Sequence, residues 1–308
     1  MKTTTEEPFK SILVALDLTE MDDYLIQYTH MLSKLLPVER IFFVHVAKDL
    51  ELPADLLKEF PGLLEPMDES IIADIQKKVD HYFDSSTLDV NCIVKEGNAI
   101  DKVLKLCKVK NIDLILMGRK KSLQGSGIVS SKIARKCPCS LLLVTQDFKA
   151  KLNKILVPVD FSDHAALAMQ RALDLSSAPS MELLMTHVYR VPIGYYKTGK
   201  SREEFEKIMQ AHAEKDCRKF LTKHSFPPDT PCEYVATDDG KHAELTHAFA
   251  EAADVDLIVI GSRGRTAASA ILMGSVAEKL VYRDSNIPIL IVKSNGENMG
   301  VLQTLMKI

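Results

Sequence analysis

The residue types best suited to chemistry form a glycine-rich string in the second half of the chain. Gly261-Ser262-Arg263-Gly264 is followed, after nine intervening residues, by Gly274-Ser275. Glycines let backbone N–H groups approach phosphate oxygens without a Cβ in the way, and a helix N-terminus adds partial positive charge. Arg263 and Arg265 can add charge-assisted contacts, and Ser275 can donate its hydroxyl. The string therefore predicts a cradle for an anionic ligand.

The spacing of this string excludes two common nucleotide-binding motifs. No Gly-Lys-Ser or Gly-Lys-Thr closes it, so it is not a Walker A loop, and no Gly-x-Gly-x-x-Gly follows a first strand. The acid that the spacing places at the same sheet edge is Asp160, which ends the apolar run at residues 155–159. Two interpretations stay open. Either the glycines and Asp160 bind a ligand, or the glycines make tight turns and Asp160 caps the next helix.

The cysteines predict no metal centre or disulfide framework. Their six positions, 92, 107, 137, 139, 217 and 232, are too sparse and irregular for paired disulfides and indicate reduced thiols in a cytosol. Cys137-Pro138-Cys139 has no second pair to complete a zinc site. We therefore expect buried structural thiols there.

The histidines do not predict a metal site either. His45 and His187 recur at equivalent places inside expected strands, where a hydrogen-bonded core histidine is the better interpretation. His242 and His247 are five residues apart, which does not place them on one helix face. His164 is close enough to Asp160 to line the rim of a site, but a solvated histidine in a first helical turn is the simpler account.

The glycine-rich string belongs to one copy of an internal repeat. Residues 12–17 (Ile-Leu-Val-Ala-Leu-Asp) return as residues 155–160 (Ile-Leu-Val-Pro-Val-Asp), 143 positions later. Residues 113–118 return as residues 256–261 at the same offset. A repeat of this length decides the whole architecture. We therefore predict two domains of one kind.

The two copies define the expected domain boundaries. The first domain is expected at residues 1–147 and the second at residues 152–294, with a C-terminal tail at 295–308. A short polar stretch, residues 145–153, joins them. A chain of 308 residues with 46% apolar composition is long enough for two buried cores.

Short apolar runs alternate with longer amphipathic segments in each copy, which is typical of a parallel sheet covered by helices on both faces. We predict β-α-β-α-β-α-β-α-β twice. In the second copy the expected elements, strand and helix in turn, are residues 154–160, 162–175, 183–189, 202–222, 232–236, 241–253, 257–260, 274 onward and 288–292. The first copy follows the same order, with its fifth strand at 140–144. Ligands of open parallel sheets bind at the carboxyl ends of the strands, where the winding reverses.

The first copy departs from the glycine-rich string where ligand contact is expected. Asp17 remains, but Lys121 stands in place of Gly264. With a one-residue deletion, Ser130-Ser131 take the place of Gly274-Ser275. A Cβ at such positions would push a phosphate away. We therefore predict a degenerate site in the first copy.

Two further loops have an alternative interpretation. Gly125-Ser126-Gly127, beside Lys120 and Lys121, can form an anion site of another geometry, although a solvated loop is the simpler account. Residues 189–200, with Tyr195-Tyr196-Lys197, can fold over a ligand as a lid, but long loops of this kind are often only mobile. We assign neither loop a role.

Charge and hydropathy exclude several classes of protein. The 39 Lys and Arg residues against 42 Asp and Glu, a net charge of −3, lack the excess that drives binding to nucleic acid. The sequence contains no run of 18 apolar residues, so it predicts no membrane-spanning helix. The N-terminus opens polar and acidic, unlike a secretory signal. We therefore expect a soluble, cytoplasmic protein that binds neither nucleic acid nor membrane.

The complete pattern, Gly-x2-Gly-x9-Gly-Ser after an apolar strand with an Asp ending strand one, resembles the ATP-binding type of the universal stress protein family. The resemblance covers nearly the whole chain as two tandem copies, and the pattern is complete in the second. It implies two open five-stranded parallel sheets of the adenine-nucleotide alpha hydrolase-like, Rossmann-like α/β class, with ATP, alone or with Mg2+, as the ligand. The binding residues that the family pattern implies are Pro158, Val159, Asp160, Val188, Ile260, Gly261, Arg263, Gly264, Arg265, Gly274, Ser275 and Val276.

Two classes of function follow from this resemblance. The first is a regulatory or stress-response module with ATP in the second domain, and the alternative is a slow ATP hydrolase or phosphotransferase. Phosphoryl transfer needs an oriented nucleophile and a metal-holding carboxylate near the terminal phosphate, and the string supplies neither. We therefore predict no catalytic residue and favour the regulator.

The expected partners are an adenine nucleotide and an unidentified protein. The two copies are expected to pack as a pseudo-dimer through their fifth strands, because apolar edge strands invite pairing. A homodimer of whole chains rests on the resemblance alone.

Overall fold

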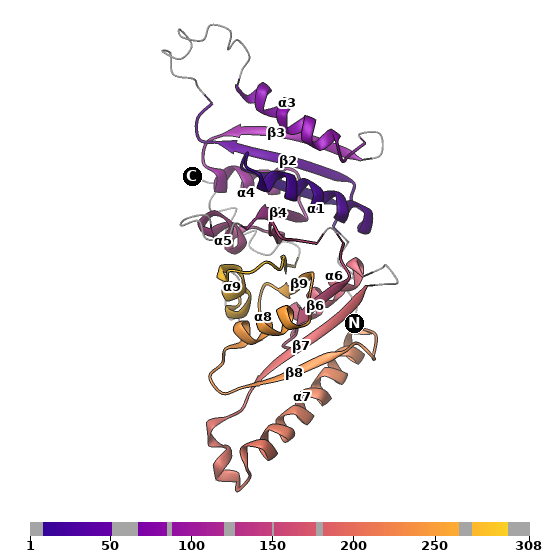
Figure 1. Ribbon diagram of the computed structural model, residues 1–308, viewed down its shortest axis with the longest axis vertical. Coiled ribbons are helices and arrows are strands. Elements are labelled where there is room, and N and C mark those ends of the chain that lie inside the picture. Colours follow the sequence, from indigo (N-terminus) through magenta and orange to yellow (C-terminus); the bar gives the residue numbers. More distant parts are fainter. Residues whose placement is uncertain are drawn as a thin grey trace. The chain divides into compact units, whose positions relative to one another are not determined.

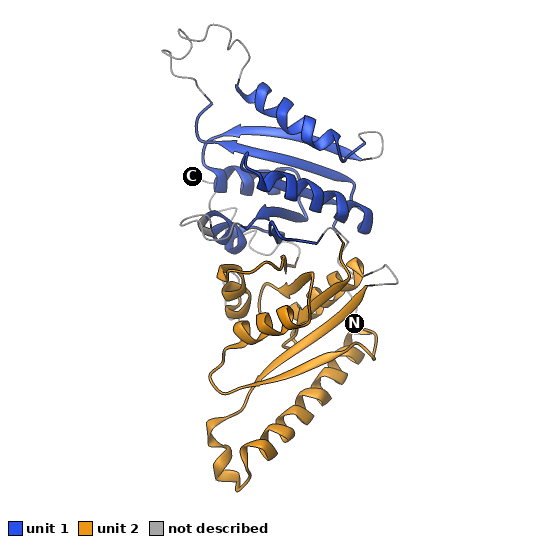
Figure 2. Ribbon diagram, viewed as in Figure 1, with its two compact units in different colours: residues 1–150, 295–308 blue, residues 151–294 orange. Residues whose placement is uncertain are grey.

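The computed structural model describes residues 9–50, 67–84, 88–119, 127–149, 151–176, 181–264 and 273–294, with residues 127 and 128 described by their backbone only. The chain divides into two compact units (Figure 2). Unit 1 comprises the described residues up to 149, and unit 2 comprises those from 151 to 294. The expected tail at 295–308 lies outside the described residues.

Unit 1 contains a five-stranded parallel sheet with strand order β3-β2-β1-β4-β5 (Figure 1). Its elements are β1 Ser11–Leu16, α1 Met21–Leu35, β2 Arg40–Ala47, α3 Met67–Asp80, β3 Asp89–Glu96, α4 Ala99–Val109, β4 Leu114–Gly118, α5 Gly127–Lys136 and β5 Ser140–Val144. The observed β5 has the predicted bounds.

Unit 2 repeats this arrangement with strand order β10-β9-β6-β7-β8, again all parallel. Its elements are β6 Lys154–Pro158, α6 Asp163–Leu175, β7 Glu182–Arg190, the short 3-10 helix η1 Ile193–Thr198, α7 Arg202–His224, β8 Cys232–Thr237, α8 His242–Ala252, β9 Leu257–Gly261, α9 Ser275–Tyr282 and β10 Ile289–Val292. The prediction of two five-stranded parallel α/β sheets is confirmed, with most bounds shifted by one or two residues.

The strand order of unit 2 locates the reversal of winding. The chain proceeds from β6 to β7 and β8, then returns to β9 and β10 on the other side of β6. Crossovers between parallel strands are right-handed, so α6 and α7 cover one face of the sheet and α8 and α9 the other. The packing agrees, since α8 contacts α9 and α6 contacts β6, β9 and β10. The winding therefore reverses between β6 and β9, the strands that precede Asp160 and the glycine-rich string.

Strands β5, β9 and β10 are almost wholly apolar because both of their faces are buried. Every residue of β5, β9 and β10 is buried. A strand buried on both faces reads as a continuous apolar run instead of an alternating one. This explains why the apolar runs in the sequence predicted the strands well.

Equivalent acids fix the starts of equivalent strands. The Asp113 carboxylate accepts hydrogen bonds from the backbone N–H groups of Lys10 and Ser11, at 3.0 and 2.9 Å. The Asp256 carboxylate, 143 positions later, accepts them from the N–H groups of Asn153 and Lys154, at 2.7 and 2.9 Å. The repeat therefore extends to individual hydrogen bonds.

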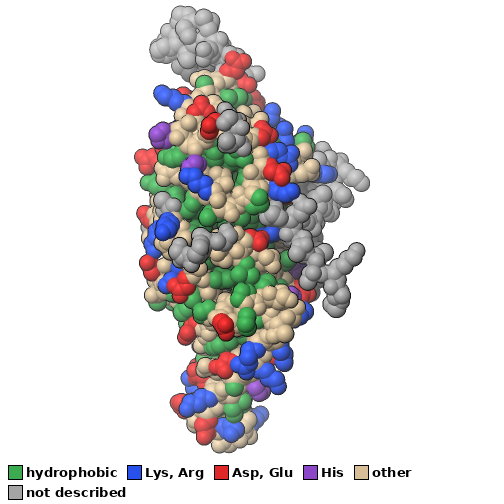
Figure 3. Space-filling model, turned by 90° about the vertical axis from the view of Figure 1, so that its right-hand side faces the viewer, with side chains coloured by type: hydrophobic (Ala, Val, Ile, Leu, Met, Phe, Trp, Pro, Cys, Tyr) green, Lys and Arg blue, Asp and Glu red, His purple; other side chains and the backbone are tan. Residues whose placement is uncertain are grey.

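The surface carries both signs of charge. On the face drawn in Figure 3, Lys and Arg side chains are interspersed with Asp and Glu, in keeping with the net charge of −3. Within the ranges that the structure describes, no helix combines the length and apolarity needed to cross a bilayer.

Candidate functional site

The carboxyl ends of β6 and β9 bring Asp160 against the glycine-rich string. A Cβ added to Gly264 would lie 2.7 Å from Oδ2 of Asp160. A Cβ added to Gly274 would lie 3.3 Å from Cα of Arg263 and 3.4 Å from the backbone nitrogen of Gly264. The end of β6, the loop after β9 and the start of α9 thus converge closely, and glycine is what permits it.

Asp160 does not cap the helix that follows it. Its Oδ1 accepts a hydrogen bond from the N–H of Ser162 at 3.1 Å. Ser162 is the N-cap of α6, and its hydroxyl accepts from the N–H of Ala165 at 3.2 Å. The capping alternative for Asp160 is therefore wrong, and its half-exposed carboxylate faces Gly264.

Gly261 has a different reason to be glycine. A Cβ there would lie 2.6 Å from the carbonyl oxygen of His164, in the first turn of α6. In unit 1 a Cβ on Gly118 would collide in the same way with the side chain of Met21, at the start of α1. Helix packing on the strand thus explains both glycines.

The start of α9 is the third segment of the site, beside the end of β6 and the loop after β9. Gly274 is its N-cap, and the Gly274 N–H donates to the carbonyl of Ser262 at 2.7 Å. Serine side chains cap α6 and α7, whereas in the described residues α8 and α9 have no side-chain cap. The first turn of an uncapped helix offers N–H donors and a partial positive charge. Ser275 is exposed and Val276 half-buried at this point.

The remaining predicted site residues lie around this convergence. Pro158 ends β6, and Ile260 is buried in β9 beside Ile291 of β10. Arg263 is half-buried in the loop after β9. Arg265 lies outside the described residues.

The neighbouring strand β7 is tied to the end of β6 through a histidine. Nδ1 of His187 donates to the carbonyl of Val159 at 2.7 Å, and the Val159 N–H donates to the carbonyl of Thr186 at 2.8 Å. His45 makes the equivalent bond in unit 1, at 3.1 Å. The prediction of a hydrogen-bonded core histidine is confirmed for buried His187, whereas His45 makes the same bond at a half-buried position. Val188, next along β7, is half-buried.

Phe161, which directly follows Asp160, also lies at this edge but belongs to none of the predicted motifs. Its backbone has φ 63°, and its ring stacks on His187 with centroids 4.4 Å apart and planes inclined by 28°. Leu18 at the equivalent place in unit 1 has φ 60°. A non-glycine residue in this region is uncommon. The only signal was an aromatic side chain placed directly after Asp160.

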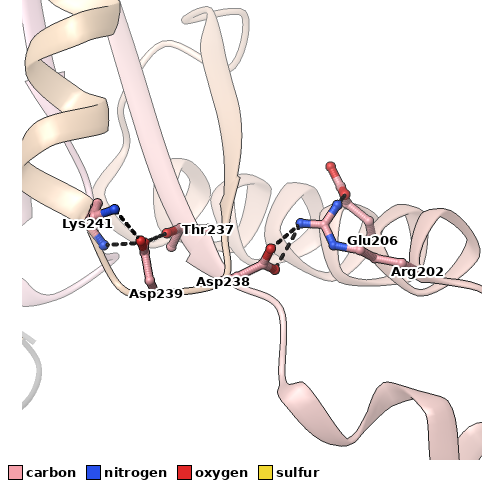
Figure 4. Close-up of polar contacts among 6 residues, drawn as sticks. All are labelled: Arg202, Glu206, Thr237, Asp238, Asp239 and Lys241. Carbon is pink, nitrogen blue, oxygen red and sulfur yellow. Dashed lines mark hydrogen bonds and ion pairs between the residues drawn. The ribbon is translucent and has the colours of Figure 1, made fainter.

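Acids at the end of β8 are already engaged by cations (Figure 4). Arg202 Nη2 donates to both carboxylate oxygens of Asp238, at 2.9 and 2.8 Å. Lys241 Nζ lies 2.6 Å from Asp239, whose carboxylate also accepts from the Thr237 hydroxyl at 3.1 Å. The Lys241 hydrogen bond holds the pKa of Asp239 below its usual value. These acids tie β8 to the starts of α7 and α8.

The cysteine prediction is confirmed at its central pair. Cys137 and Cys139 are buried, and the Cys137 thiol donates to the carbonyl of Cys139 at 3.2 Å. Among the described residues, no three His, Cys, Asp or Glu side chains are grouped to hold a metal ion.

The sequence of each unit matches the same protein-family model. The model of the universal stress protein family matches residues 8–145 and again residues 151–293. The chain belongs to this family. It is a tandem universal stress protein, with one copy of the family domain in each unit.

Relatives with a single copy match about half of this universal stress protein. Universal stress protein YxiE of Bacillus subtilis is 30% identical over 157 residues, which covers 46% of this chain and 99% of YxiE. Universal stress protein MJ0577 of Methanocaldococcus jannaschii is 28% identical over 155 residues, which covers 46% of this chain and 94% of the relative.

Solved structures match both copies together. The functionally unknown protein PA1789 of Pseudomonas aeruginosa has a TM-score of 0.70 at 15% identity, covering 97% of this chain and 98% of the other. A universal stress protein of Archaeoglobus fulgidus has a TM-score of 0.61 at 18% identity, covering 92% and 96%. At these identities the likeness establishes the Rossmann-like fold and nothing finer.

The structure corrects the alignment of the two copies at the last helix. Helix α5 begins at Gly127, so Ser130 and Ser131 lie inside it and are buried, and they do not form its start. Buried Ser130 matches buried Ala277 of α9, which makes Gly127 the counterpart of Gly274. Eight residues separate Gly118 from Gly127, whereas twelve separate Gly261 from Gly274. The first copy has thus lost four loop residues, not one.

This correction changes the argument for a degenerate first copy. The glycine at the helix start is retained, and the differences that remain are the shorter loop, Lys121 in place of Gly264, and Ile128 in place of Ser275. Lys121 and the alternative anion loop at Lys120 and Gly125-Ser126 lie outside the described residues.

Proposed function

We propose that this universal stress protein is a regulatory, stress-response module that binds one adenine nucleotide, ATP, in unit 2. The observation that carries the proposal is the approach of Gly264 to Asp160, where a Cβ would lie 2.7 Å from the carboxylate. It supports a ligand site because the approach occurs where the winding reverses, the usual place for ligands in open α/β sheets. The family membership supports it further.

The residues present suit an adenine nucleotide. Backbone N–H groups of the loop after β9 and of the first turn of α9 would hold phosphates, assisted by Arg263 and the exposed Ser275 hydroxyl. The Asp160 carboxylate can accept hydrogen bonds from a sugar or base. The half-buried Val188 can contact the base through its apolar side chain and its backbone. A Cβ at Gly264 or Gly274 would fill the space where these segments meet. The bound nucleotide would supply negative charge that changes what this edge of unit 2 presents to a protein partner.

We also propose that hydrolysis is very slow or absent. The carboxylates of Asp238 and Asp239 are engaged by Arg202 and Lys241, and Oδ1 of Asp160 is engaged by the Ser162 N–H. Such acids are poorly suited to hold a metal or to orient a water. Phosphoryl transfer needs both functions together with charge stabilisation.

Two measurements test these proposals. Mass spectrometry of small molecules released from the purified, denatured protein should detect an adenine nucleotide, and calorimetry of the emptied protein with ATP should give one site per chain. Two equivalent sites, or none, would contradict the binding proposal.

Hydrolysis is tested by phosphate release in a single turnover with protein in excess. We expect a rate far below the enzyme range of about 1–10³ per second. A rate within that range, abolished by Ser275→Ala and unaffected by Gly194→Ala at an exposed position of η1, would favour the hydrolase alternative.

A further inference from the structure

Two cysteines of unit 2 form a cluster that the nucleotide proposal does not use. Cys217 lies in α7 with 3% of its surface exposed, and Cys232, the first residue of β8, is half-buried. The two thiols lie close enough to interact with each other, and both interact with the Tyr234 hydroxyl. Both thiols are free.

The fold brings these cysteines together through the connection between α7 and β8. Helix α7 ends at His224, and Ser225 turns the chain with φ 58°. The Phe226 N–H donates to the carbonyl of Leu221 at 3.0 Å, and the Phe226 ring packs 5.7 Å from that of Phe220. Strand β8 then runs alongside α7 (Figure 1). A residue two turns before the end of the helix therefore meets the first residue of the strand.

The surroundings shift the pKa values of the two thiols in opposite directions. The hydrogen bond from Cys232 lowers the pKa of Cys217, with further lowering by Tyr234 and by the positive charge of Arg218. The same bond and burial raise the pKa of Cys232. In unit 1, burial raises the pKa of Cys92 to about 11, which makes that thiol a poor nucleophile. The thiolate is the form that reacts with oxidants.

We propose that Cys217 and Cys232 are a modification site at which hydrogen peroxide forms a disulfide between α7 and β8. The Cys217 thiolate attacks one peroxide oxygen, the O–O bond breaks, and the departing hydroxide takes up a proton as water, leaving a sulfenic acid. The Cys232 thiol then attacks the sulfenic sulfur, the S–O bond breaks, and a second water leaves with the thiol proton. Two thiols lose two electrons, and peroxide is reduced to two waters. Partly exposed Cys232 gives the oxidant access to the pair.

The test maps disulfides in the full-length protein. The reduced chain is treated with one equivalent of hydrogen peroxide, blocked with N-ethylmaleimide and digested with trypsin without reduction. We expect the peptide of residues 216–218 linked to that of residues 224–241, and a fall in free thiols from six to four per chain. A thiol count that stays at six, or a disulfide joining other cysteines, would overturn the proposal.

Matched variants sharpen the result. Cys217→Ser should keep all five remaining thiols after the same treatment, because the attacking thiolate is gone. Cys232→Ser should lose only the Cys217 thiol, as a sulfenic acid without a disulfide, whereas Cys92→Ser should still lose two. Loss of two thiols in Cys217→Ser would overturn the proposal. The mapping of the unmodified sequence decides the question even if a variant fails to fold.

Discussion

Gly264 and Gly261 lie three residues apart, and each position requires glycine for a different reason. The atom nearest to a Cβ on Gly264 is a carboxylate oxygen of Asp160, the movable end of a half-exposed side chain. The atom nearest to a Cβ on Gly261 is the backbone carbonyl oxygen of His164, which cannot move alone. Binding and stability are therefore separable at these two positions.

Substitution of Gly264 by Val should weaken ATP binding at least about tenfold, a loss of about 1.4 kcal/mol. The side chain would displace the Asp160 carboxylate and fill the space beside it. Isothermal titration calorimetry measures the change. Gly194→Ala is the matched control, because a Cβ at Gly194 meets nothing within 4 Å.

An unchanged affinity in Gly264→Val would remove the loop after β9 from the binding site. Gly261→Ala should behave differently and mainly lower the free energy of unfolding, by about 1–3 kcal/mol, because overpacking against backbone is costly. Urea unfolding distinguishes the two variants.

His224 should make stability fall as the pH falls. Its ring packs against those of Phe220 and Phe226, at 5.1 and 5.6 Å, and burial with the charge of Lys223 lowers its pKa. The folded state therefore binds this proton less readily than the unfolded chain, whose histidines titrate near about 6.5. The stabilisation is present above that value and is lost as the pH falls through it towards the lower, folded pKa.

The measurement is urea unfolding of the wild type and His224→Phe at pH 7.5 and pH 5.5. The variant has no titrating ring, so it should lose less stability between the two pH values. His30, whose pKa burial also lowers, is common to both proteins and cancels in the difference. Equal losses would show that His224 does not titrate differently on folding.

At the scale of elements, an acid at the start of one strand holds the start of its neighbour in each sheet. Asp256 is 5% exposed and accepts two backbone N–H groups at the start of β6, as Asp113 does for β1. A removed carboxylate would leave two backbone donors without this acceptor. Hydrogen bonds to charged groups contribute about 1.5–3 kcal/mol each.

Asp256→Ala should therefore lower the free energy of unfolding by about 3 kcal/mol. Asp256→Asn keeps one oxygen acceptor and should cost less. Asp229→Ala, at an exposed position in the turn before β8, is the control and should stay within about 0.5 kcal/mol. Equal stability of Asp256→Ala and the control would show that the strand start does not depend on this acid.

At the scale of the whole molecule, we predict that the two units associate as a pseudo-dimer. Within its own unit, each of β5 and β10 has a neighbouring strand on one side only, and both strands are apolar apart from Ser140, the first residue of β5. Apolar strands of this kind invite pairing. Residues 1–149 and 151–294, expressed separately and mixed, should form a one-to-one complex in analytical ultracentrifugation. Two stable monomers without mutual affinity would refute the shared-edge model.

Much of the fold was predictable because its signals are local. Apolar runs mark strands buried on both faces, and the 143-residue offset carries each element from one copy to the other. The bounds of β5 and the cap of α6 at Ser162 depend on a few neighbouring residues. The glycine-rich string and Asp160 were also visible, because strand order places the ends of β6 and β9 side by side.

What only the tertiary structure decided involves contacts between distant residues. The start of α5 at Gly127 depends on which face of the helix is buried in the core. Because the preceding loop differs in length between the two copies, aligning their sequences does not locate this start. The need for glycine at position 261 comes from the first turn of α6, almost a hundred residues earlier. The Cys217 and Cys232 thiols meet because one turn reverses the chain. Periodicity records which residues are buried, but packing alone decides which of them touch.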